Sequence, residues 1–362
     1  MNYMGQRPFV SVVVPALNCA DEVDDFAACM RAQTYPAECF EVLLIDNGSD
    51  DDTFARASRA GLTTLRRRDR GRARALNTGV AAARGEYLLT TDMSCRAAAD
   101  WIESVVATFA AYPDAGCVAG DIRLLKTVDG PAIRYQERSD YMSPLLALSR
   151  TRLPFLPFAD GANASFPRRL FDEIGGFEES FIKAADVEIC YRLLMLTRHS
   201  IIFNRHALVW EPGEETLGAL LKQRFRMGIG THLLRMKYPA LYASQTASWD
   251  LRQRYWKLRE AVTNFLGLLR LDCLALLGSC RHEATDANVR FLMSLAQGLG
   301  HASGRRRLAH LGLQPQPVDS ERIARFLIDA DPVRDRIKVV EIPSSPATVP
   351  AATPPVGDGP RR

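Results

Sequence analysis

The chain has 362 residues, of which 47% are hydrophobic and 24% charged, enough apolar sequence for one large or two modest domains. Its formal net charge of +4 is small for this length, so the overall charge does not predict a nucleic-acid partner. The eight cysteines include no Cys-x-x-Cys pair, which excludes the usual zinc-ribbon and thioredoxin patterns and favours reduced thiols in a cytosolic protein. The first residues, MNYMGQRPF, lack the apolar core of a signal peptide.

Strand-like and helix-like segments alternate through the first third of the chain. Runs rich in β-branched or apolar residues predict strands at 9–18, 41–46, 62–65, 86–92 and 115–125. Apolar residues at helical spacing predict helices from Val23 to Met30, after the polar turn 47–53, at 73–83 and at 98–112. This alternation predicts a mostly parallel sheet with helices on both faces.

The rest of the chain gives weaker patterns. Pro144, Pro154 and Pro157 predict that 126–160 is a loop over the site, and 161–235 is expected to be a second lobe on the same sheet. A basic helical tail follows, with Arg252, Arg254, Lys257 and Arg259. The apolar run 261–280 contains Arg270 and Asp272, so we expect a buried or membrane-surface helix and no membrane span. The Pro- and Ala-rich end from 342 is expected to be disordered.

Polar residues follow two of the predicted strands. Asp46 and Asp92 both stand at strand ends, and ligands of parallel sheets bind at the carboxyl ends of the strands. The chain has no Gly-x-Gly-x-x-Gly after its first strand and no P-loop, which argues against a dinucleotide cofactor and P-loop ATP hydrolysis. A bound nucleotide would therefore depend on side chains. Asp46 and the turn Asp50–Asp52 are suited to accept hydrogen bonds from a uracil or ribose.

Six segments carry a family resemblance: SVVVPALN, EVLLIDNGSDDDT, GRARALNTGVAAARGEYLLTTD, GANASFPRRLFDEIGGFEESF, DVEICYRL and QRFRMG. In this order and spacing, over residues 9–235, they resemble family 2 glycosyltransferases. The resemblance implies a GT-A fold, with a mostly parallel sheet flanked by helices and a helical C-terminal extension. We accordingly expect a catalytic domain at 1–235, a helical region at 236–341 and a disordered tail at 342–362.

The resemblance also implies roles for single residues. Asp186 matches the catalytic base, Asp46 the contact to the donor base, and Asp92 the first metal-binding carboxylate of an Asp-x-Asp motif. Further donor- or acceptor-side positions are matched by Pro15, Asn18, Arg72, Asn77, Asn163, Gln223, Arg224 and Arg226. Plain structural roles remain open: Asp46 as a turn residue, Arg72 as part of a solvated basic patch at 66–74, and Asp186 as a helix cap.

Three positions depart from the family pattern. The second carboxylate of Asp-x-Asp is Ser94, the acidic neighbour of the base is Ala185, and the aromatic of the Gln-x-x-Arg-Trp-like motif is Met227. A neutral serine is a weaker metal ligand, so another group must compensate. Glu211, in VWEPGEE, is our candidate, with a surface turn residue as the alternative.

The expected reaction is inverting transfer of a sugar from a nucleoside-diphosphate sugar, assisted by Mg²⁺ or Mn²⁺. The resemblance leaves a glycan, a lipid-linked intermediate, a peptide or a small molecule open as acceptor. We expect a cytoplasmic protein with possible contact to the inner membrane face, no nucleic acid, and an undetermined oligomeric state. Two alternatives stay open: a catalytically impaired relative that binds nucleotide or glycan, and a sugar-phosphate nucleotidyltransferase, although the Gly-rich first loop of the latter is absent.

Overall fold

This computed structural model describes residues 7–139, 142–149, 155–242, 281–310, 312, 315–319, 323, 326 and 333–342. The strands are β1 (Val10–Ala16), β2 (Phe40–Asp46), β3 (Thr63–Arg66), β4 (Tyr87–Thr90), β5 (Arg96–Ala97), β6 (Ala115–Leu125), β7 (Ala164–Pro167), β8 (Ser200–Pro212) and β9 (Ile337–Val340). The helices are α1 (Val23–Arg31), α2 (Thr53–Arg59), α3 (Arg72–Ala82), α4 (Trp101–Ala111), α5 (Pro131–Arg138), α6 (Pro144–Leu148), α7 (Arg168–Ile174), α8 (Ala185–Leu196), α9 (Leu217–Lys237) and α12 (Arg281–His310).

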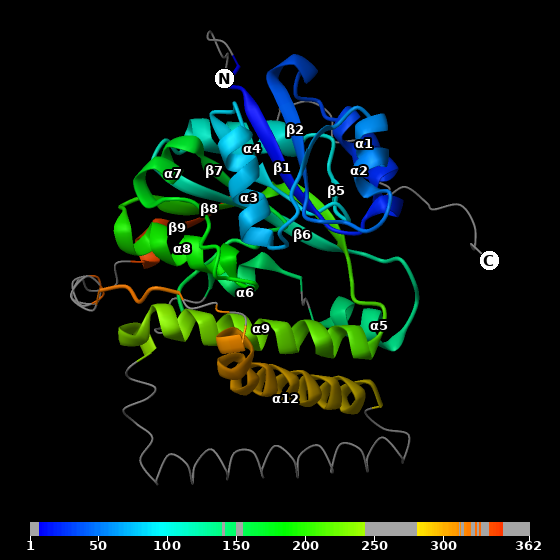
Figure 1. Cartoon of the computed structure of the whole chain (residues 1–362), viewed down its shortest axis with the longest axis vertical. Helices are drawn as coiled ribbons and strands as arrows, with labels where there is room; N and C mark the ends of the chain where they lie inside the picture. The colour runs from blue at the N-terminus through cyan, green and yellow to red at the C-terminus, as the bar shows by residue number, and fades with distance from the viewer. Residues whose placement is uncertain are drawn as a thin grey trace.

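The strands of this described part form one sheet in the order β3-β2-β1-β4-β7-β6-β8-β5, with β9 also paired to β8 (Figure 1). Five of the eight pairings are parallel and three, all involving β7 or β5, are antiparallel. The predicted mostly parallel sheet is confirmed, and β7 and β8 confirm that the segment after 161 packs onto the same sheet. Because β2, β1 and β4 run in parallel, their carboxyl ends meet at one edge.

Alternating residues of β1 build the core on both faces of the sheet. Val12 and Val14 pack into a cluster that contains residues of α1, α2 and α4. Val13 packs into a second cluster with residues of α3, α7 and α8. A strand covered on both faces has no solvated side, which explains its unbroken run of apolar residues.

The five strands predicted in the first third are present, as are the helices predicted between them. The prediction of a loop over 126–160 is wrong, because α5 and α6 lie within it. Pro131 and Pro144 each stand in the first turn of one of these helices, where the missing N–H costs nothing. Pro157 is buried. Pro154, the basic cluster 252–259, the apolar run 261–280 and the tail from 343 lie outside the described residues.

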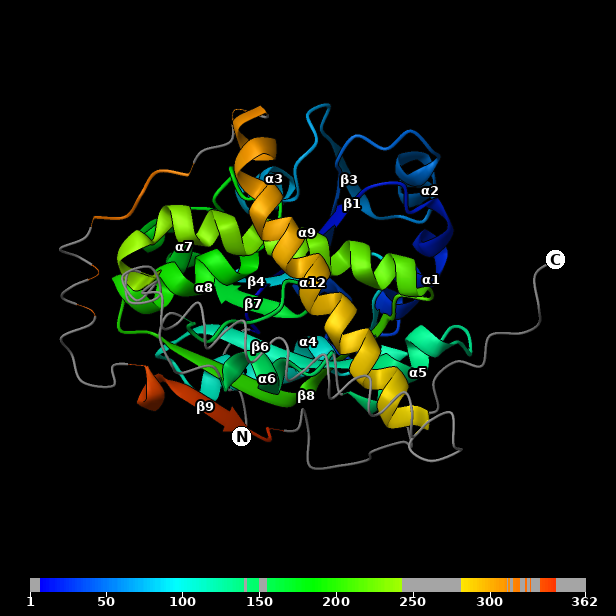
Figure 2. The ribbon, with the colours of Figure 1, turned by 90° about the horizontal axis from the view of Figure 1, so that it is seen from below.

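Two long helices, α9 and α12, cross one another on the side of the sheet toward which β1 runs (Figures 1 and 2). Glycines make this crossing possible. A Cβ at Gly228 would collide with the carbonyl of Gln297, and one at Gly300 would collide with that of Phe225. Thr216 caps α9 by accepting a hydrogen bond from the N–H of Ala219 at 3.1 Å. None of the described helices combines the length and apolarity needed to cross a bilayer.

Candidate functional site

Arg72 stands where α3 begins, at the carboxyl edge of the sheet. The side chain of Asn47 holds this end of the helix by accepting a hydrogen bond from Gly71 N at 2.8 Å. The guanidinium of Arg72 forms an ion pair with Asp92, just beyond β4, and its Nη2 donates to the carbonyl of Gly161 at 3.3 Å. Burial lowers the pKa of Arg72, but the neighbouring carboxylates, Asp92 first, raise it overall, so the guanidinium is a permanent cation.

Asp186 lies in the first turn of α8 and faces the same loop. Its Oδ2 accepts a hydrogen bond from Gly161 N and its Oδ1 accepts one from Val187 N, each at 3.0 Å. The amino end of a helix also favours a negative charge. Gly161 is thus held between Arg72 and Asp186, where an added Cβ would lie 3.1 Å from Arg72 Nη2 and 3.4 Å from the Asp186 side chain. The structure therefore brings Asp92, Arg72 and Asp186 together.

Buried ion pairs fix the helix that carries Asp186. Glu188 is fully buried, and its carboxylate accepts hydrogen bonds from Arg192 at 2.9 and 2.6 Å and from the hydroxyl of Tyr238 at 2.8 Å. Lys237, the last residue of α9, lies 2.8 Å from the same carboxylate and 2.6 Å from Glu178. The pKa of Arg192 is raised, chiefly by Glu188 against the opposing effect of burial. Glu188 therefore positions α8 and takes no part in the cleft.

Asp160 is a functional candidate that the sequence reasoning missed. Its side chain is exposed, yet dense protein surrounds it, and lost hydration together with the charges of Asp186 and Asp92 raises its pKa to about 6. Ala162 N donates to Oδ1 at 3.0 Å, and the described residues offer Oδ2 no hydrogen bond. The signal was present in the sequence: this carboxylate directly precedes the GAN segment that was quoted for the resemblance.

Glu211, near the end of β8, faces the same group of carboxylates. Its pKa is raised well above the ordinary value, first by burial and then by the charges of Asp160 and Asp92, with Arg72 acting in the opposite direction. The neighbouring Cys95 thiol also has a raised pKa, because of burial and then the charges of Glu211 and Asp92. Because β5 and β8 pair Arg96 with Trp210, Glu211 follows a residue that lies opposite the end of the Asp92-Met93-Ser94 turn. Compensation for Ser94 by Glu211 stays a prediction.

The chemistry of these donors fits a divalent cation. Asp92, Asp160, Asp186 and Glu211 bring four carboxylates around the one guanidinium of Arg72, and their mutual repulsion is relieved when a cation binds. No three His, Cys, Asp or Glu side chains of the described residues already stand in a metal-binding arrangement. A magnesium ion needs only one or two carboxylates when substrate phosphates complete its coordination.

Asp46 is separate from these contacts. Its side chain is 0% exposed, with Oδ1 accepting from Ser49 N and Oδ2 from Arg66 Nε, both at 2.9 Å. Asn18 has a positive φ of 54° and accepts a hydrogen bond from Asp50 N at 2.9 Å, which ties the turn after β1 to the turn after β2. Pro15 pairs in register with Ile45 inside the sheet. The expected direct contact between Asp46 and a donor base thus needs Arg66 to move.

The two asparagines expected at the site use their amides inside the protein. Asn77 accepts a hydrogen bond from Phe177 N at 2.7 Å and donates to Phe177 O at 2.9 Å. Asn163 is buried, accepts from Trp101 Nε1 at 2.9 Å and donates to the carbonyls of Asp121 and Ala207 at 2.8 Å. Both amides brace loops beside the cleft, and a direct contact of either amide with substrate stays a prediction.

The Gln-x-x-Arg-like segment lies on α9. Gly230 packs against Ala184, next to the start of α8, and Gln223, Arg224 and Arg226 lie about one to two turns earlier on the same helix. Arg226 is exposed, and Met227, which replaces the expected aromatic, is 40% exposed. These arginines therefore stand on a helix that packs beside Asp186.

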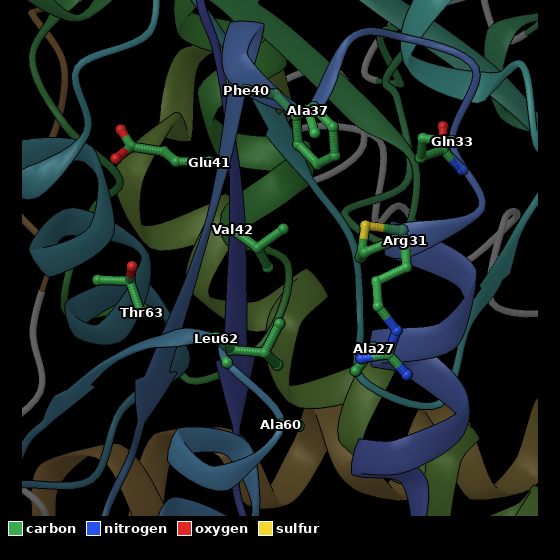
Figure 3. Close-up of a pocket in the computed structure, with 12 residues that line it drawn as sticks. Ala27, Arg31, Gln33, Ala37, Phe40, Glu41, Val42, Ala60, Leu62 and Thr63 are labelled. Carbon is green, nitrogen blue, oxygen red and sulfur yellow. The ribbon is translucent and has the colours of Figure 1, made fainter.

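A surface groove of about 380 Å³ lies away from this cleft (Figure 3). It runs between the end of α1 and the amino-terminal halves of β2 and β3, with Arg31, Gln33, Glu41 and Thr63 as its polar residues. Since the carboxylates gather at the opposite ends of the strands, the groove is not the candidate active site.

Sequence comparisons relate the chain to known glycosyltransferases. The model for glycosyl transferase family 2 matches residues 11–175, and that for glycosyl transferase family group 2 matches residues 136–297. The glycosyltransferase AglE of Haloferax volcanii is 27% identical over 229 residues, 62% of this chain and 73% of its own length. The poly-β-1,6-N-acetyl-D-glucosamine synthase of Staphylococcus epidermidis is 24% identical over 67% of this chain, but the match spans only 60% of the synthase.

A solved structure with the same fold is the mannosyltransferase PcManGT of Pyrobaculum calidifontis in complex with GDP-mannose and Mn²⁺. It superposes with a TM-score of 0.50 over 90% of this chain and 85% of its own, at 22% identity. This likeness confirms the predicted GT-A type of fold. The two family models together cover strands β1 to β8, the cleft and α9, so the chain is similar to the family 2 glycosyltransferases over residues 11–297.

Proposed function

We propose that the chain transfers a hexose from a nucleoside-diphosphate sugar to an acceptor hydroxyl with inversion, and that Asp186 is the general base. The observation that supports this most directly is the chain of contacts from Asp92 through Arg72 and Gly161 to Asp186. It joins a cation to a carboxylate across a single loop. Displacement at an anomeric carbon needs those two groups on opposite sides of the reacting bond.

In the reaction, the acceptor oxygen forms a bond to the anomeric carbon while the bond from that carbon to the diphosphate oxygen breaks. The acceptor proton goes to Asp186, and the electron pair of the breaking bond leaves with the nucleoside diphosphate. Each oxygen of Asp186 accepts one backbone N–H and keeps a lone pair for the hydroxyl. A positioned base of this kind contributes about 10²–10⁴-fold to the rate.

Arg72 is the cation that stabilises the negative charge on the leaving diphosphate. Its raised pKa keeps it charged, and Asp92 and the carbonyl of Gly161 fix its orientation. Arg224 and Arg226 on α9 are further basic candidates for this role. Asp160 offers its unengaged Oδ2 to a sugar hydroxyl.

Asp92 and Glu211 are the residues that would hold Mg²⁺ or Mn²⁺ in this proposal. The ion, when bound, neutralises charge on the diphosphate. Glu211 takes the place of the carboxylate that Ser94 lacks. The pKa of Glu211 is raised by burial and by the charges of Asp160 and Asp92, which supports a position close to other negatively charged carboxylates.

The decisive experiment is a panel of labelled nucleotide sugars incubated with the protein, with and without Mn²⁺. Release of the nucleoside diphosphate from at least one donor, lost in Asp186→Asn, supports the proposal. Nucleotide binding without turnover on any donor would instead favour the catalytically impaired alternative. Consumption of a nucleoside triphosphate would identify a nucleotidyltransferase.

We also propose that the protein contacts a membrane surface through α12. A lipid-linked acceptor would reside in that membrane. Phe291, Leu292, Leu295 and Leu299 form a stripe 37–56% exposed, and the neighbouring Arg290 is exposed. An exposed apolar stripe with a basic residue beside it suits an anionic lipid surface. Co-flotation with anionic vesicles that is lost in the pair Leu295→Glu and Leu299→Glu tests this proposal, and an unchanged flotation of that variant refutes it.

A further inference from the structure

The donor-base side of the site contains an ion pair that the sequence motifs do not predict. Asp46 and Arg66 are register partners at the carboxyl ends of β2 and β3. Arg66 Nε donates to Asp46 Oδ2 at 2.9 Å, while Ser49 N donates to Oδ1 at the same distance. Since the Asp46 side chain is 0% exposed, its carboxylate is covered and both of its oxygens are engaged.

The guanidinium of Arg66 is fixed from a second direction. Its Cζ lies 4.2 Å from the ring centroid of Phe54 on α2, within the range of a cation–π contact. The side chain is nevertheless 55% exposed, and its two terminal nitrogens make no hydrogen bond to the described residues. Arg66 is therefore a partly exposed, planar donor group that is held beside Asp46 in a defined orientation.

We infer that Arg66 reads the base of the donor nucleotide and selects a base with two neighbouring hydrogen-bond acceptors. This inference depends on the proposed function, because it assumes a nucleoside-diphosphate donor. Arginine binds the O6 and N7 acceptors of guanine with both arms of its fork. Cytosine carries neighbouring acceptors at O2 and N3. On the edge formed by O2, N3 and O4, uracil and thymine place an N–H donor between two acceptors. They therefore offer no two neighbouring acceptors to the two N–H groups of the arginine.

Direct recognition of uracil by Asp46 is disfavoured for the same reason. The N3–H of uracil needs a free acceptor, and Asp46 becomes free only when Arg66 leaves. That movement gives up a hydrogen bond to a charged group and the contact with Phe54. GDP and CDP, by contrast, bind to the arrangement as it stands.

The test is isothermal titration of GDP, CDP, UDP, dTDP and ADP in the presence of Mn²⁺, on the parent protein and on Arg66→Lys. Lysine keeps a cation beside the buried Asp46 but lacks the planar fork of arginine. Arg66→Lys should therefore fold, whereas Arg66→Ala would leave the buried charge of Asp46 uncompensated. Arg84→Lys is the matched control. Arg84 also pairs with a carboxylate, Glu41 at 3.0 Å, and lies 5.0 Å from the ring of Phe9, but at the other end of the strands.

We expect GDP or CDP to bind at least about ten-fold more tightly than UDP and dTDP, which is within the discrimination of one bidentate pair. Arg66→Lys should remove most of this preference, and Arg84→Lys should retain it. Tightest binding of UDP, or an unchanged ranking in Arg66→Lys, overturns the inference and leaves the proposed function intact. If the parent protein binds none of the five diphosphates, the proposed function fails as well.

Discussion

Asp160→Asn should make the protein more stable at neutral pH, because the carboxylate of Asp160 is held among like charges. Its pKa of about 6 exceeds the ordinary value of 3.8, so the folded state binds this proton more tightly than the unfolded state does. Stability contributed by the protonated form is present at low pH and is lost as the pH rises from about 4 to about 6. Above that range the charged Asp160 opposes folding in full, and asparagine does not.

The size of the effect follows from the same two values. A change of one in pKa corresponds to about 1.4 kcal/mol, so the interval from 3.8 to about 6 bounds the effect at about 3 kcal/mol. The side chain is exposed, and solvent screening reduces the interaction of exposed charges to about 1 kcal/mol. For a chain of this length, that gain corresponds to a rise in Tm of about 1–3 °C.

Denaturant unfolding between pH 4 and pH 8 measures this difference directly. Asp172→Asn is the matched control, since Asp172 is an exposed residue of α7 outside the cleft. The gain of Asp160→Asn should be largest at pH 7 and vanish toward pH 4, while the control stays flat. A variant that is less stable than the parent at pH 7, or a gain that does not depend on pH, would refute the account of Asp160 as a carboxylate among like charges.

Three further predictions concern the cleft. Asp186→Asn should lower kcat by about 10²–10⁴-fold with donor Kd nearly unchanged, and full activity in a radiolabel transfer assay would exclude Asp186 as the base. Glu211→Ala should weaken Mn²⁺ binding in a calorimetric titration, and a variant that binds Mn²⁺ and turns over normally would rule out the compensation for Ser94. Gly161→Ala, which crowds Arg72 Nη2 at 3.1 Å, should lower kcat/KM about ten-fold with little change in Tm, and wild-type kinetics would show that the loop tolerates the methyl group.

The sequence was sufficient for the sheet and for placing Asp46 and Asp92 at strand ends, because strand ends are encoded in local periodicity. The meeting of Asp92 with Asp186 was implied only by the family resemblance. Prolines misled the prediction for 126–160. Pro144 begins a helix, and a proline in the first helical turn looks the same in sequence as a proline in a loop.

The sequence also could not predict the direction in which a polar side chain points. Asn77 and Asn163 stand in the expected segments, but whether an amide faces a ligand or a carbonyl depends on contacts about 40 to 100 residues away. The cover over Asp46 depends on Arg66, which reaches it only through the register of β2 with β3. Asp160 was overlooked because its raised pKa arises from burial and from the charges of Asp186 and Asp92, neither of which is a neighbour in sequence.

The buried contact between Glu188 and Lys237 bears on where the catalytic unit can be cut. The recognisable motifs end near 235, and a shortened clone stopping there would retain every one of them. It would also take Lys237 and the hydroxyl of Tyr238 away from the buried carboxylate of Glu188 and leave Arg192 as its counter-ion, and each lost hydrogen-bond partner of a buried group costs about 1–3 kcal/mol. Engineers who transplant this catalytic module should therefore carry the chain through at least Tyr242, whose ring is also buried.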